Sequence, residues 1–140
     1  MADFFLTRTE IAKKLEEITD FKKIYTPLNS SKITEGQQVT PSAHVNFVRI
    51  DVEATESKGK AVLLGKRWSV TVACSNAASQ VDGSLVADQA GELLNQVVLL
   101  LSGFQPTAAR ESMQLVAVTE GVSQSAMYLT AVFLSREFVR

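Results

Sequence analysis

The chain carries one histidine and one cysteine, the side chains that most readily act as bases, nucleophiles or metal ligands near neutral pH. A zinc site or a catalytic pair needs several such residues at a characteristic spacing, and this chain has no motif of that kind. His44 stands alone just after Pro41, and Cys74 lies in an alternating, strand-like run. We therefore expect a structural or exposed histidine, an inert core thiol, and no catalytic residue, metal or cofactor.

Motifs that activate a serine or bind phosphate are also missing: the chain has neither G-x-S-x-G nor G-x-x-x-x-G-K-[ST]. Its densest positive charge consists of Lys58, Lys60, Lys66 and Arg67. A cluster of this kind is either a solvated hairpin or a surface for an anionic partner, so the four residues are candidates for a partner interface. The formal net charge of -1 argues against a specific nucleic acid partner.

The composition predicts a single soluble domain over residues 1–140. A chain of 140 residues with 46% hydrophobic positions can bury one core of useful size. No apolar run approaches the ~20 residues that span a bilayer, so we expect no membrane partner. The single cysteine excludes an intramolecular disulfide, which a chain of this size does not need.

The first third of the chain predicts a helix, a short strand and a long loop. Thr7-Arg8-Thr9-Glu10 has the spacing of a capping box, so the helix should begin near residue 8 and continue to about Ile18. The segment 21–25 is typical of a short strand. The polar segment 26–41 exceeds the ~12 to 15 residues of most loops in compact domains, which makes it a candidate partner-binding arm. Its candidate contact residues are Glu35 and Gln37.

Two alternating segments, from residue 43 and over 67–75, predict a pair of long strands. In the second strand Trp68, Val70, Val72 and Cys74 share one face, so the sheet should be buried on one side. The segment 54–65 joins the two strands and carries charge near Lys58-Gly59-Lys60. We expect a long hairpin with a charged tip, whose arms run past the core.

A helix over 85–101 follows, capped by Ser84, with an apolar stripe too wide for one sheet face to cover. Either two elements of the chain sandwich this helix or its flank meets a neighbouring subunit. Gly103 lies where a left-handed residue ends a helix, and Pro106 blocks continuation. Strands over 114–119 and 127–138 close the chain.

The resulting order is α-β-β-β-α-β-β, an α+β fold with a mostly antiparallel sheet and both helices packed on one face. The residues expected to mark the core and the turns of this fold are Trp68, Gly103, Phe104 and Pro106.

This succession of landmarks resembles the small tail terminator proteins of tailed bacteriophages over nearly the whole chain. The resemblance is carried by Phe21-Lys22-Lys23-Ile24-Tyr25, Pro41, Arg67-Trp68, Ala90-Gly91, Leu101-x-Gly103-Phe104-x-Pro106 and Phe133-Leu134. Phe104 stands where the family pattern has tryptophan.

The resemblance implies a structural virion protein and no enzyme. It implies a ring, usually a hexamer, that caps the tail tube, ends its elongation and offers the docking surface for the neck or head, with DNA passing through. The implied partners are further copies of the chain, the tail tube protein and neck or head-tail connector proteins. The implied location is the virion, after assembly in the host cytoplasm.

Two alternative functions remain at this stage. Another neck or head-completion protein would share the small size and the lack of catalytic residues. A small-molecule binding or regulatory domain would need convergent polar groups on an apolar pocket lining, and the sequence offers no such set.

Overall fold

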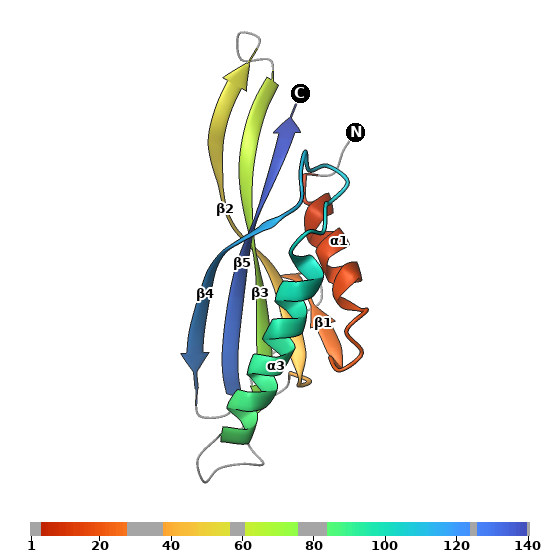
Figure 1. Ribbon diagram of the computed structural model, residues 1–140, viewed down its shortest axis with the longest axis vertical. Helices are drawn as coiled ribbons and strands as arrows, with labels where there is room; N and C mark the ends of the chain where they lie inside the picture. Colours follow the sequence, from red (N-terminus) through yellow and green to blue (C-terminus); the bar gives the residue numbers. More distant parts are fainter. Residues whose placement is uncertain (1–3, 28–37, 57–60, 76–83, 124–125, 140) are drawn as a thin grey trace.

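The protein is an α+β domain in which two helices lie on one face of a five-stranded sheet (Figure 1). The computed structural model describes residues 4–27, 38–56, 61–75, 84–123 and 126–139. The elements, in chain order, are α1 (Leu6–Leu15), β1 (Lys23–Tyr25), β2 (Ser42–Glu56), β3 (Ala61–Ser75), α3 (Ser84–Leu101), β4 (Gln114–Val122) and β5 (Ala126–Val139). The predicted fold class and element order are confirmed.

The strands lie in the order β1-β2-β3-β5-β4. The pair β1–β2 is parallel, and the other three pairs are antiparallel. Strands β2 and β3 pair as far as Glu56 and Ala61, so most of the connection expected at 54–65 is strand. The hairpin and the end of β5 rise past the helices, as Figure 1 shows, so the expectation of arms that run past the core is confirmed.

The core lies between the helices and one face of β2, β3 and β5. The alternating residues of β3, from Trp68 to Cys74, are fully buried, as the period of two requires. Phe133 of β5 pairs with Trp68 and is buried beside it. The helices cover this face with side chains at three-and-four spacing, namely Ile11 and Leu15 of α1 and Ala90, Leu93, Val97 and Leu101 of α3.

Helix α1 begins at Leu6, two residues earlier than the capping box predicts, and that prediction is wrong. Its N-cap is Phe5, without a side-chain capping bond. Thr7 Oγ1 donates instead to Glu137 Oε2 at 2.7 Å, and Glu10 Oε1 accepts from the backbone N–H of Thr107 at 3.1 Å. The same side chains that could cap the helix thus connect it to distant parts of the chain.

The end of α3 agrees with the prediction. Gly103 has φ +92°, a left-handed conformation that glycine adopts without the steric cost of a Cβ. The N–H of Ser102 donates to the carbonyl of Val98, and the N–H of Phe104 donates to that of Leu101. The chain then turns away from the helix toward β4, which starts at Gln114.

Candidate functional site: the polar networks and the sheet edges

The two residues considered for catalysis lie on different faces of the sheet. Cys74 is fully buried on the helix side, where burial raises the pKa of its thiol to about 11 and keeps it protonated. His44 pairs with Thr71 on the opposite face, and its ring stacks on Tyr25 with centroids 4.8 Å apart. Burial lowers the pKa of His44. The two side chains therefore do not form a catalytic pair.

Metal ligation finds no support in the described ranges, 4–139 with their gaps, because they contain no group of three or more His, Cys, Asp or Glu side chains that could hold an ion. A groove beside α1 is lined by Glu10, Lys13, Lys14, Glu16, Glu17 and Phe104. Five of these six side chains are charged.

The basic cluster expected at 58–67 does not lie on one surface. Lys66 is 2% exposed and forms an ion pair with Glu137, so its assignment to a solvated hairpin or an outward surface of the single chain is wrong. Arg67 points to the other face, part-exposed, with Nε 3.6 Å from Asp51 Oδ2. Lys58 and Lys60 lie outside the described residues. The arm residues Glu35 and Gln37 lie outside them too.

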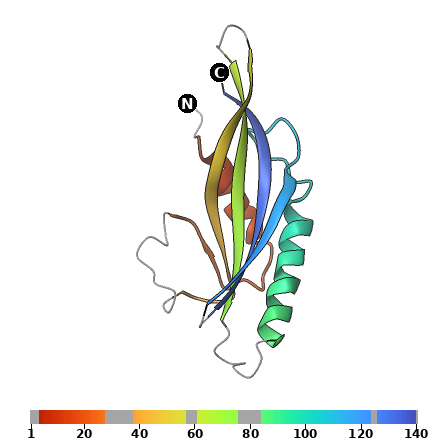
Figure 2. The ribbon, with the colours of Figure 1, turned by 90° about the vertical axis from the view of Figure 1, so that its left-hand side faces the viewer.

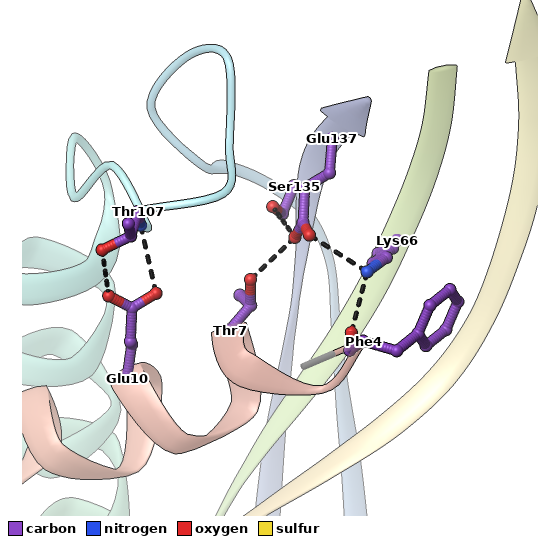
Figure 3. A network of polar contacts seen from close by, with 7 residues as sticks. All are labelled: Phe4, Thr7, Glu10, Lys66, Thr107, Ser135 and Glu137. Carbon is purple, nitrogen blue, oxygen red and sulfur yellow. Dashed lines mark hydrogen bonds and ion pairs between the residues drawn. The ribbon is translucent and has the colours of Figure 1, made fainter. Parts of the chain in front are cut away.

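Lys66 belongs to a buried polar network that ties the N-terminal segment to the sheet (Figure 3). Its Nζ lies 3.0 Å from Glu137 Oε1 and donates to the carbonyl of Phe4 at 2.8 Å. The second carboxylate oxygen of Glu137 accepts from Thr7 at 2.7 Å and from Ser135 at 2.8 Å. Both charges are thus partnered, as burial of an ion pair requires.

Aromatic contacts hold the same segment in place. Lys66 Nζ lies 3.9 Å from the ring centroid of Phe4, within cation–π range. The ring of Phe5 meets Phe47 and Trp68 edge to face, with centroids 5.9 and 6.3 Å apart. The N-terminal segment therefore packs on the upper part of the sheet, next to the rising hairpin.

A second polar network crosses the open face of the sheet, opposite the helices. Gln38 Nε2 donates to the hydroxyl of Tyr128 at 2.9 Å, and Gln38 Oε1 lies 3.0 Å from His44 Nε2. The N–H of Val39 donates to the hydroxyl of Tyr25 at 3.0 Å. The C-terminal end of the long connection is therefore fixed from β1 to β5, an arrangement that the polar composition of 26–41 did not predict.

The edge strand β4 is the most exposed element of the described chain, since all nine of its residues are exposed. Helix α3 packs on β3 and β5 and stops short of covering β4. Large apolar side chains are consequently left in solvent on β4, namely Leu115, Val116, Val118 and Val122. Leu99 on α3 is 80% exposed.

Further apolar side chains are exposed near the opposite edge of the sheet. Strand β1 pairs only with Ser42–His44 of β2, so in the described part of the chain β2 has β3 as its single strand neighbour after His44. Phe47 and Val48 of this part are 38% and 46% exposed. The sheet thus has an exposed apolar region at each of its two edges, and such regions mark surfaces that contact other proteins.

In the described part of the chain, the two apolar sheet edges and the separation of His44 from Cys74 are the features of an assembly component. The family model for phage tail terminator proteins matches residues 1–140, so the chain belongs to that family. Members of this family are structural tail proteins of virions.

The fold is shared with a solved phage-like particle. One chain of the structure titled "Virion of native gene transfer agent (GTA) particle" superposes with a TM-score of 0.61 at 10% identity. The match covers 98% of this chain and 100% of that chain. At this identity the likeness concerns the fold alone.

No curated protein sequence matches the chain. None of the described helices is both long enough and apolar enough to pass through a membrane.

Proposed function

We propose that the protein forms a ring that caps the tail tube, ends tube elongation and provides the docking surface for the neck or head. The observation that carries this proposal is the exposure of all nine residues of β4 on a sheet whose other edge also presents apolar side chains. A contact between two different surfaces of identical copies closes into a ring when the rotation allows it.

The family resemblance supports six copies in the ring, and we adopt that number. The partners are then further copies of the chain, the tail tube protein on one side and a neck or connector protein on the other. The DNA passes through the ring without base-specific contacts, in keeping with the net charge of -1. Assembly takes place in the host cytoplasm, and the finished ring stays in the virion.

The tall hairpin is the element proposed to reach the tube or the neck. It projects beyond the helices (Figure 2), and Lys58 and Lys60 belong to its tip in the sequence. Arg67 lies on β3, on the open face. A protein with only the ring function could do without such an extension, so its length supports a contact outside the ring.

The test is the length of tail tubes made with and without this protein. Tube protein from the same virus is polymerised, the protein is added, and lengths are measured by electron microscopy. We expect growth to stop and one end of each tube to carry a cap, whereas a buffer control keeps growing. A charge reversal of Lys58 and Lys60 together should weaken capping and leave the fold intact by circular dichroism.

Unchanged tube lengths, with the protein free in solution, would contradict the capping function. Capture of the protein by a neck or head-completion component without any effect on the tube would favour the alternative role as another neck protein.

A further inference from the structure

We propose that the β4 edge of one copy docks against the β1–β2 edge of the next copy, and that this contact repeats around the ring. The inference rests on the proposed function and deepens it by naming the two surfaces that meet. The pairing register of the sheet relates each residue of one edge strand to the residue at the same position along the strand direction, here called its height, on the other edge.

Apart from one bulge, strand β4 lacks the devices by which sheets protect a free edge. Such edges are usually short, or they carry lysine, proline or a covering segment. Strand β4 is nine residues long, with neither lysine nor proline, and its one charged residue is Glu120. A single bulge lies between Leu115 and Ala117. An uncovered strand of this kind is suited to pairing with a second chain.

The apolar residues of the two edges lie at the same height. Leu115 of β4 pairs with Phe133, which pairs with Trp68, which pairs with Phe47 of β2. Both end members of this row, Leu115 and Phe47, are 38% exposed, and Val48 beside Phe47 is 46% exposed. A rotation about an axis parallel to the strands moves one edge onto the other without a change of height. Leu115 of one copy then meets Phe47 of the next.

The charged residues of the two edges lie within one or two residues of equal height. Glu120 belongs to the row that runs through Leu129, Val72 and Ala43 to Ile24 of β1. Lys22 and Lys23, next to Ile24, are both exposed. Rotation therefore brings Glu120 to within one residue of the height of Lys23 of the neighbouring copy.

The charge around each edge supports the same pairing. Strand β4 and α3 contain Asp88, Glu92 and Glu120 and no lysine or arginine. A contact between two β4 edges would bring two acidic surfaces together and would end at a dimer. A contact between β4 and the β1–β2 edge joins opposite charges and leaves a new β4 edge available for the next copy.

Disulfide trapping tests the contact directly. Glu120→Cys protein and Lys23→Cys protein are mixed under mild oxidation, and each is also oxidised alone. We expect a covalent dimer in the mixture only, and a ladder up to the full ring from the double variant E120C/K23C. A mixture of Glu120→Cys with Lys13→Cys, an exposed site on α1, is the matched control and should give no dimer.

Other patterns of trapping would overturn the proposal. A dimer from Glu120→Cys protein alone would show that two β4 edges meet. Equal dimer yields from the Lys23 and Lys13 partners would show random collision. Wild-type protein controls for the native Cys74, whose burial should keep it unreactive.

Charge exchange gives a second, reversible readout. Light scattering across a concentration series measures association of wild type, Glu120→Lys, Lys23→Glu and the double exchange. Each single variant should associate about tenfold more weakly, because like charges then meet, and the double exchange should recover most of the loss. Val118→Lys should weaken association at least as much, since an inward charge blocks edge pairing. Leu99→Lys, on the flank of α3, should leave it unchanged.

The outcomes separate this inference from the function on which it rests. A wild-type ring that Glu120→Lys, Lys23→Glu and Val118→Lys leave intact would overturn the interface and keep the ring. A loss of association with Leu99→Lys alone would assign the contact to the flank of α3. A wild-type protein that stays monomeric, with no ladder from E120C/K23C, would overturn the interface and the ring together.

Discussion

Substitution of Lys66 by methionine removes one charge from the buried ion pair of Figure 3 and keeps most of the side-chain length. Lys66 Nζ lies 3.0 Å from Glu137 Oε1, and the two side chains are 2% and 4% exposed. The variant would leave the carboxylate of Glu137 inside the protein without a cation. Loss of one partner from a buried pair costs about 3 to 5 kcal/mol.

The expected cost lies near the lower end of that range, at about 3 kcal/mol, because Glu137 keeps two hydroxyl donors. Thr7 and Ser135 donate to its other oxygen at 2.7 and 2.8 Å. For a chain of this length, about 3 °C of melting temperature correspond to 1 kcal/mol, which gives a fall of about 9 °C. The Phe4 carbonyl would lose its donor as well, so the N-terminal segment should become more accessible to proteases.

The assay is urea unfolding followed by circular dichroism, at one protein concentration for all variants, because self-association shifts apparent stability. Lys13→Met, at an exposed lysine of α1 outside the proposed contact, is the control and should change the free energy of unfolding by less than about 0.5 kcal/mol. The double variant K66M/E137Q removes both charges and should lie within about 2 kcal/mol of wild type. If Lys66→Met behaves like the Lys13 control, the buried pair does not stabilise this protein.

Three further predictions concern single positions. Gly103→Ala should lose about 1 to 2 kcal/mol, because φ is +92° there, whereas Gly91→Ala inside α3, where nothing lies near the added Cβ, should gain about 0.5 to 1 kcal/mol in the same unfolding assay. Gly65→Ala should destabilise wild type by about 1 kcal/mol, because the new Cβ overlaps the carboxylate of Glu53, and it should have little effect in a Glu53→Ala background. Since burial lowers the pKa of His44 below its ordinary 6.5, the unfolded chain binds more protons as pH falls through 6.5, so stability should decrease from pH 7.5 to 5.5, and His44→Asn should flatten that dependence.

The strands and α3 could be predicted from the sequence because their signals are local. The alternation from Trp68 to Cys74 fixes which face of β3 is apolar, and that face is the buried one. The glycine at 103 ends α3 where a left-handed residue is needed. These features follow from backbone geometry and side-chain period, which neighbouring residues determine.

The start of α1 was predicted wrongly because its capping residues have stronger partners far away in the chain. Thr7 and Glu10 fit a capping box in isolation, but Glu137 and Thr107 take up their hydrogen bonds. A local motif predicts structure only where no distant group competes for the same atoms. The exposure of β4 could not be predicted from local sequence either, because an apolar strand has the same residue pattern whether or not another element covers it.

The fold class, the element order, the buried face of the sheet and the lack of catalytic motifs could all be predicted from the amino-acid sequence, because each depends on residue type and spacing along the chain. The role of Lys66 as an internal ion-pair partner, and not as part of a surface cluster, became visible in the folded chain alone. The tertiary structure also decided that Glu120 and Lys23 lie within one residue of the same height on opposite edges of the sheet. Both facts depend on strand register and burial, which join residues that are distant in the sequence.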